Sequence, residues 1–85
     1  MEQFYVYILF SESYNKYYVG QTHDLQSRIE EHNSKRGGGF TSKYVPWDLV
    51  YHEIFESRVE AVKREKEIKN KKSRKYIEWL ISNPH

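Results

Sequence analysis

Glu65 is the residue whose type and position most directly suggest chemistry. On a helical wheel, the centre of the apolar arc formed by Ala61, Val62 and Ile68 falls on this carboxylate. A carboxylate on a core-facing stripe is costly unless it is paired or binds a cation. Glu65 is therefore either the ligand of a divalent metal in a small cleft or half of a buried ion pair, with Arg28 as the expected partner.

Arg28 and His32 are carried toward the core by the helix that we expect from Leu25 to about Asn33. Asp24 is suited to be the N-cap of this helix. Arg28 and His32 fall on the same side as the apolar residues of the helix, Leu25 and Ile29, which must face the sheet. The planar donors of arginine match phosphate oxygens, and histidine has an intrinsic pKa suited to moving protons at neutral pH.

Tyr7 and Tyr18 belong to a predicted β-hairpin that spans residues 4–20. Its first seven residues are all apolar or aromatic, and both faces of this run are apolar, so we expect a central strand covered on both sides. A polar turn over 11–16 leads into the second strand, which would bring the two tyrosine hydroxyls close together. Taken alone, the hairpin favours tyrosines that anchor a core and hydrogen-bond at its edge.

The remaining elements follow from local patterns. Residues 34–39, SKRGGG, indicate a basic glycine-rich loop, and the chain from Thr41 to Pro46 is expected to be irregular. Residues 47–55 read as a third strand, and Ser57 with Glu60 forms a capping box for a helix that runs to about Asn70. A last helix is expected over 73–81, with Pro84 beyond its end.

The length and composition indicate one small domain over residues 1–85. There is no cysteine, so disulfides and thiolate zinc sites are excluded. No apolar run approaches the ~20 residues of a membrane span. We expect a cytoplasmic, monomeric protein with no membrane association.

The basic residues are concentrated near the C-terminus. Residues 58–75 contain nine basic and three acidic side chains, a net charge of +6, whereas the rest of the chain has a net charge of −4. Such a segment indicates either a polyanionic partner or simply a solvated helix surface. If the partner is a nucleic acid, the expected phosphate contacts are Lys43, Lys69, Lys72 and Arg74.

An ordered set of motifs resembles the GIY-YIG nuclease family. The set consists of Tyr-Val-Tyr at 5–7, Tyr-Val-Gly at 18–20, Arg28, and Glu65 followed by Ile68-Lys69. More narrowly, the chain is similar to small stand-alone bacterial members, which are related to the N-terminal nuclease domain of the nucleotide-excision-repair excinuclease. The resemblance covers essentially the whole chain.

The resemblance implies an α+β fold, with a small three-stranded, antiparallel-type sheet flanked by three helices. It also implies cleavage of DNA phosphodiester bonds with Mg²⁺ or Mn²⁺, in DNA repair or recombination. From the small size of the domain, we expect either structure-selective or weakly selective cutting, on branched or damaged DNA, or recruitment by a protein partner. The site residues it implies are Tyr7, Tyr18, Arg28, His32 and Glu65, with Glu65 as the metal ligand.

The chain departs from the family pattern at three points. Tyr5 stands where the family name has its first glycine, Gln21 stands where excinuclease-like members tend to have lysine, and an asparagine found after the glutamate in some members has no counterpart. These departures bear on proton transfer more than on the fold, and Tyr7, Tyr18 and His32 all stay open as the general base.

Two other functions compete with a nuclease. A non-catalytic nucleic-acid-binding module would stack bases on tyrosines of an open sheet face and follow the phosphates with its basic segment. A structural or interaction domain would use Glu65 and Arg28 as a buried ion pair.

Overall fold

The computed structural model describes residues 2–34 and 39–83, apart from the side chains of residues 39 and 40. The predicted hairpin is confirmed: β1 spans Phe4–Ser11 and β2 spans Lys16–Thr22, and the two pair in antiparallel fashion. β3, Asp48–Phe55, pairs with the other side of β1, so the sheet order is β2-β1-β3. The glycine-rich loop predicted over 34–39 and the predicted Pro84 terminator fall mostly outside the described residues.

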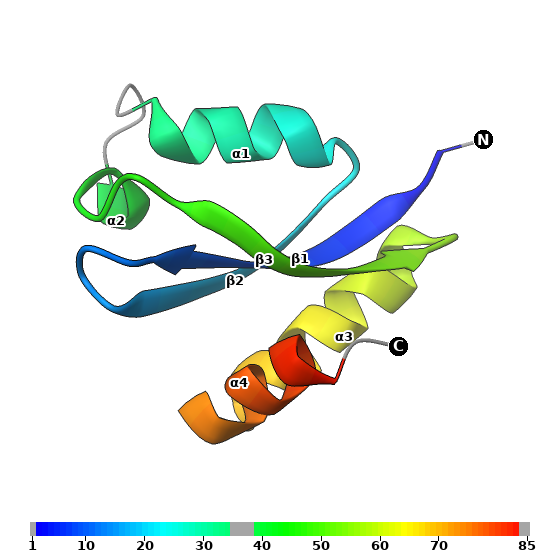
Figure 1. Cartoon of the computed structure of the whole chain (residues 1–85). Coiled ribbons are helices and arrows are strands. Elements are labelled where there is room, and N and C mark those ends of the chain that lie inside the picture. The colour runs from blue at the N-terminus through cyan, green and yellow to red at the C-terminus, as the bar shows by residue number, and fades with distance from the viewer. Residues whose placement is uncertain (1, 35–38, 84–85) are drawn as a thin grey trace.

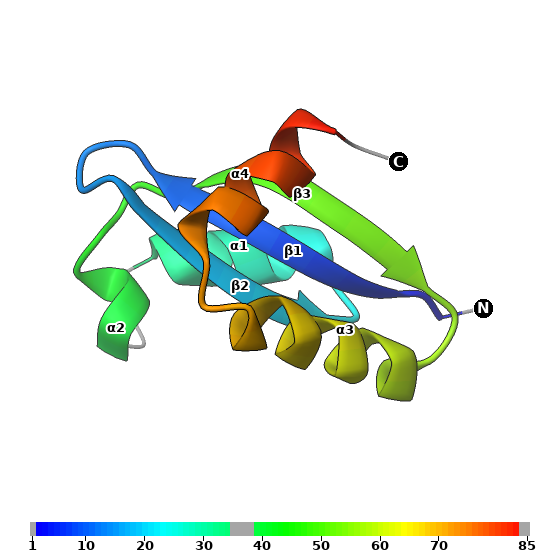
Figure 2. The same ribbon diagram turned by 90° about the horizontal axis from the view of Figure 1, so that it is seen from below.

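Helices cover both faces of the sheet, as Figure 1 shows. α1, Leu25–Asn33, and the short α2, Gly39–Ser42, lie on one face. α3, Arg58–Asn70, and α4, Arg74–Ser82, lie on the other, with α3 toward β2 and α4 toward β3 (Figure 2). In the described ranges, no helix has the length and apolar character needed to cross a membrane.

The central strand separates two hydrophobic cores, as its alternation predicts. Val6 and Ile8 point into the core beneath α3 and α4, whereas Tyr7 and Leu9 point into the core beneath α1. All four side chains are fully buried. Burying apolar area on both faces stabilises the middle strand most, by roughly 25 cal/mol for each Å² removed from water.

A β-bulge in β3 changes the predicted alternation of that strand. The β1–β3 register shifts between Ile8, which pairs with Tyr51, and Leu9, which pairs with Leu49. Tyr51 therefore enters the α3–α4 core, whereas Leu49 lies with Tyr5 on the α1 face. The simple two-residue period placed Leu49 and Tyr51 on one face, and this was wrong because a bulge inserts one unpaired residue.

The helix ends confirm the capping patterns in the sequence. The side chains of Asp24 and Ser57 accept hydrogen bonds from the backbone of Ser27, at 3.2 Å, and Glu60, at 3.2 Å. The α2 helix was missed, because its four residues carry no apolar period. This segment is tied to the strand end instead, since Trp47 Nε1 donates to the carbonyl of Thr41 at 2.8 Å.

Candidate active site

Gly20 provides the space in which the Tyr7 phenol lies. The two residues face each other across the β1–β2 ladder. A Cβ built on Gly20 would lie 2.6 Å from Tyr7 Cζ and 3.1 Å from Tyr18 Cε2, which is closer than side-chain atoms pack. The glycine of the Tyr-Val-Gly motif is thus required by the close approach of the Tyr7 ring, not by a turn.

Gly20→Ala tests this packing. The added methyl overlaps the Tyr7 ring, and overpacking of this kind costs about 2 kcal/mol. For a domain of this size, the melting temperature should fall by roughly 10 °C in thermal unfolding followed by circular dichroism. Lys63→Ala, a change at an exposed helix position that adds no bulk, should leave it nearly unchanged. A Gly20→Ala protein as stable as the parent would contradict the placement of the Tyr7 ring.

His32 is brought to Tyr7 by α1. The imidazole is buried, and its Nε2 lies 2.9 Å from the Tyr7 hydroxyl oxygen. The His32 ring centroid is 5.9 Å from that of Tyr7 and 4.8 Å from that of Tyr18, and the two tyrosine rings are 6.3 Å apart. The three rings form one cluster, as expected from the sequence.

Burial keeps Tyr7 and His32 neutral at pH 7. Burial raises the pKa of Tyr7 to about 12, against a lowering effect of hydrogen bonding with Arg28, while the charges of Tyr18 and Glu65 add to the rise. Burial also lowers the pKa of His32 below its ordinary value, and the positive charge of Arg28 lowers it further. One proton lies between the two neutral groups, and the imidazole tautomer determines which of them donates it.

Arg28 lies beside this cluster with part of its guanidinium uncommitted. Its Nη1 donates to Glu31 at 3.1 Å on the exposed side. Hydrogen bonding with Tyr7 raises the pKa of the guanidinium, which stays charged. Its Nε is buried and has no hydrogen-bond partner within the described chain. A buried donor of this kind is costly unless an oxygen ligand completes it.

Glu65 is mostly withdrawn from water, with 18% of its side chain exposed, as the core-facing stripe predicts. Its partner is Lys69, whose Nζ lies 2.6 Å from Glu65 Oε2. The ion pair with Arg28 that the sequence left open does not form between these described residues, because Arg28 pairs with Glu31. Lys69 Nζ, which pairs with Glu65, lies 5.9 Å from the centroid of the Tyr18 ring, so the carboxylate is near the ring cluster.

The carboxylates do not form a ready metal cage. Within residues 2–34 and 39–83, no group of three or more histidine, aspartate or glutamate side chains could hold an ion. Glu65 is the carboxylate near the ring cluster. Mg²⁺ is commonly bound by one or two carboxylates, several waters and a substrate phosphate. The donor set therefore fits Mg²⁺ or Mn²⁺ with Glu65 as one ligand and with waters, or waters and a phosphate, completing the shell.

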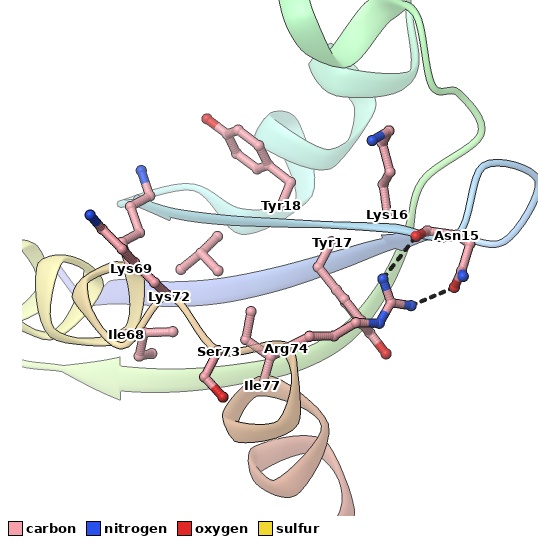
Figure 3. Close-up of a pocket in the computed structure, with 11 residues that line it drawn as sticks. Asn15, Lys16, Tyr17, Tyr18, Ile68, Lys69, Lys72, Ser73, Arg74 and Ile77 are labelled. Atoms are coloured by element: carbon pink, nitrogen blue, oxygen red, sulfur yellow. Dashed lines mark hydrogen bonds between the residues drawn. The ribbon is translucent and has the colours of Figure 1, made fainter.

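Three of the four predicted phosphate contacts line a single groove of about 490 Å³ between β2 and the junction of α3 and α4 (Figure 3). These are Lys69, Lys72 and Arg74, and Lys16, which the sequence did not single out, joins them. Lys43 is exposed but does not line this groove.

Arg74 also has a structural role in the groove. Its guanidinium donates to the Asn15 carbonyl at 3.0 Å and to Glu78 at 3.2 Å, and it lies over the Tyr17 ring at 4.8 Å. These contacts fasten the β1–β2 turn to α4. No local pattern indicated this role, because Arg74 and Asn15 lie 59 residues apart.

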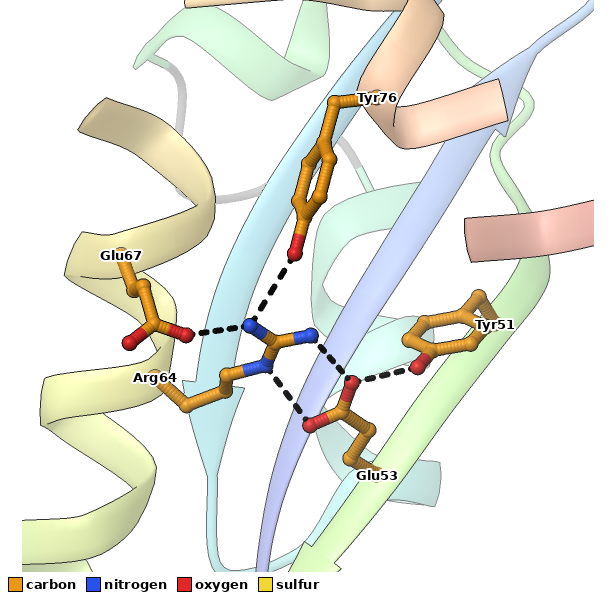
Figure 4. Close-up of polar contacts among 5 residues, drawn as sticks. All are labelled: Tyr51, Glu53, Arg64, Glu67 and Tyr76. Atoms are coloured by element: carbon orange, nitrogen blue, oxygen red, sulfur yellow. Dashed lines mark hydrogen bonds and ion pairs between the residues drawn. The ribbon is translucent and has the colours of Figure 1, made fainter. Parts of the chain in front are cut away.

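A second polar cluster, which sequence reasoning missed, fixes α3 on the sheet (Figure 4). Arg64 forms a bidentate pair with Glu53, with both N···O distances 3.0 Å, and donates to the Tyr76 hydroxyl at 3.2 Å. Glu67 and Tyr51 complete the cluster. Hydrogen bonding to Glu53 raises the pKa of Arg64, which is the residue just before Glu65. The cluster therefore limits rotation of α3 and so helps to orient Glu65.

The comparisons with known proteins agree with this geometry. Residues 3–77 match the family described as GIY-YIG catalytic domain. A UPF0213 protein of Staphylococcus saprophyticus is 36% identical over 94% of this chain and 96% of its own length. One from Staphylococcus haemolyticus is 42% identical over 81% of this chain and 83% of its own.

A solved structure is similar as well. The solution NMR structure of a UPF0213 protein from Bacillus halodurans has a TM-score of 0.58 and 38% sequence identity, over 94% of this chain and 83% of that one. Together with the match over 3–77, the Tyr7 ring seated over the glycine of Tyr-Val-Gly shows that this chain belongs to the GIY-YIG nuclease family.

Proposed function

We propose that this protein is a divalent-metal-dependent endonuclease that hydrolyses DNA phosphodiester bonds. The observation that carries the proposal is the convergence of the Tyr7, Tyr18 and His32 rings, with the Glu65–Lys69 pair beside the Tyr18 ring. Arg28 is presented by the same helix as His32, one turn earlier. Nicking of supercoiled plasmid DNA in Mg²⁺ or Mn²⁺ is the direct test, with EDTA as the control. Persistent DNA binding without any metal-dependent nicking would contradict it.

Glu65 is the residue that would hold the metal ion. Its carboxylate would supply one or two oxygen ligands, and the DNA phosphate and water molecules would supply the remaining ligands of the ion. When bound, such an ion polarises the phosphate and neutralises charge that develops on the leaving oxygen. Arg28 adds fixed positive charge from the other side of the cluster, with its buried Nε free to donate to a phosphate oxygen.

Between Tyr7 and His32, the electrostatics favour His32 as the proton acceptor. A phenol with a pKa of about 12 holds its proton at neutral pH, so Tyr7 is a poor base. His32 is neutral there and can accept a proton. The Tyr7 hydroxyl lies 2.9 Å from His32 Nε2, so it fixes the orientation of the imidazole.

The pH profile of cleavage tests this role. Protonation of His32 removes the acceptor, so kcat/KM should be flat above about pH 6.5 and fall as the pH drops through the lowered pKa of His32. His32→Ala should lower kcat/KM by roughly 10²-fold and abolish that acid limb. His23→Ala, at an exposed histidine, should keep both rate and limb. An acid limb that persists in His32→Ala would exclude His32 as the acceptor.

Base stacking on an open tyrosine face is a weaker alternative. Tyr7 is fully buried, so it cannot stack on a base. Its ring lies in the cluster with His32 and Tyr18, and the Glu65–Lys69 pair lies beside Tyr18, which favours chemistry over binding alone. We propose that the protein cuts branched or damaged DNA with little sequence preference, as a cytoplasmic monomer recruited by a protein partner in repair or recombination.

A further inference from the structure

The carboxylate assigned to the metal is already occupied by a cation of the protein itself. Lys69 lies one helical turn after Glu65, and its Nζ is 2.6 Å from Glu65 Oε2. Only 18% of the Glu65 side chain is exposed, compared with 48% of Lys69. The two charges are therefore in direct contact at a position where water reaches the carboxylate less than the ammonium group. A divalent ion that binds Glu65 has to replace this ammonium group.

Lys69 also lies where a phosphate strand would pass. Its Nζ is 5.9 Å from the centroid of the Tyr18 ring, at the border of the site. The same side chain lines the basic groove with Lys16 and Lys72. Figure 3 shows the ammonium groups of Lys16 and Lys69 on the side of β2 to which the Tyr18 ring points. Lys69 therefore joins the metal ligand to the groove.

We propose that Lys69 competes with the divalent ion for Glu65 in the free protein and releases it when a phosphate strand enters the groove. The proposal rests on the proposed function. Under this proposal, metal binding and DNA binding strengthen each other. The metal ion binds Glu65 and frees Lys69 for a phosphate, and the phosphate binds Lys69 and frees Glu65 for the metal ion. By linkage, the factor by which DNA tightens metal binding equals the factor by which metal tightens DNA binding.

Other cations near the site are less suited to this role. Arg74 is held by Asn15, Glu78 and the Tyr17 ring, and Arg28 donates to Glu31. Lysine carries a compact charge on a flexible stem, so Lys69 can exchange a carboxylate for a phosphate oxygen without a change of backbone.

Binding of Mn²⁺ to the full chain without DNA tests the competition, measured from the electron paramagnetic resonance signal of free Mn²⁺. Lys69→Met should tighten Mn²⁺ binding about fivefold or more, within the usual range of such couplings. Lys66→Met removes the same charge from an exposed neighbour that has no ion pair in the described chain, and it should change the affinity less than about twofold. Glu65→Gln should abolish the binding.

DNA binding in EDTA supplies the reciprocal measurement, by fluorescence anisotropy of a labelled duplex. Glu65→Gln should increase the affinity for DNA, because it frees Lys69. In a double-mutant cycle, the increase in DNA affinity caused by Glu65→Gln should be at least about threefold smaller in the Lys69→Met background than in the parent. If Lys69→Met binds Mn²⁺ like the parent while Glu65→Gln does not bind it, the competition is refuted and the metal ligand stands. If Glu65→Gln still binds Mn²⁺ like the parent, the metal assignment fails as well.

Discussion

Glu65→Gln is expected to reduce metal-dependent nicking of supercoiled DNA by at least about 10³-fold. The amide keeps the size of the side chain but lacks the negative charge that attracts a divalent ion. Loss of this charge removes several kcal/mol of transition-state stabilisation, and a thousandfold loss corresponds to about 4 kcal/mol. Initial rates of conversion from supercoiled to nicked plasmid in Mg²⁺ and in Mn²⁺ measure the effect.

The fold should survive this change. Glu65 is partly exposed and its partner Lys69 is half exposed, so losing the pair should cost less than about 1 kcal/mol of unfolding free energy. Glu60→Gln is the matched control, because this exposed acid lies on the same helix but bonds only the Ser57 N-cap in the described structure, a role that glutamine can also fill. It should retain full nicking activity. If Glu65→Gln nicks DNA like the parent, Glu65 does not hold the metal.

Arg28→Ala is expected to lower kcat by roughly 10²-fold, with a smaller change in KM. Removing one fixed donor to the charge that develops in the transition state typically costs about 3 kcal/mol. Arg28→Lys should recover less than about tenfold of the loss, because an ammonium group cannot present the planar donors of a guanidinium. Single-turnover cleavage rates at saturating enzyme separate this effect from DNA binding.

Glu31→Gln controls for the visible ion pair of Arg28. The Arg28–Glu31 pair is largely exposed and contributes little to stability, so this variant should cleave and unfold like the parent. A fully active Arg28→Lys protein would show that only a positive charge is needed, and that the geometry of the buried Nε has no part in the reaction.

The sequence predicted the elements of the site because each one has a local signal. The apolar run at 4–10, the Asp24 N-cap and the Ser57–Glu60 capping box specify a strand and two helix starts without reference to distant residues. The periodicity of α1 placed His32 inward, where it is buried. The inward direction of Glu65 followed from the same argument.

The pairing of charges could not be predicted in this way. The sequence left open an ion pair between Glu65 and Arg28, whereas the structure pairs Glu65 with Lys69, one turn away on the same helix. The Arg64–Glu53 pair joins a helix to a strand, and Arg74 reaches a turn from the other end of the chain. Such contacts depend on how the elements pack, and no local pattern encodes them.

The site forms at the exposed edge of β2, where elements from both faces of the sheet meet. α1 presents Arg28 and His32 from one face, and α3 presents Glu65 from the other. The Arg64 cluster holds α3 against β3, so the carboxylate keeps its position relative to a ring cluster on the far side of the sheet. The sheet therefore holds the site residues of α1 and the site residue of α3 in a fixed arrangement.

The central claim is that Glu65 holds a divalent ion beside the tyrosine and histidine rings. The most direct measurement is an anomalous difference map from crystals of the protein with a DNA duplex and Mn²⁺. The account predicts a peak within about 2.2 Å of a Glu65 carboxylate oxygen, with Lys69 moved toward a phosphate. A map with no Mn²⁺ peak at Glu65, and with Lys69 still paired to it, would contradict the account.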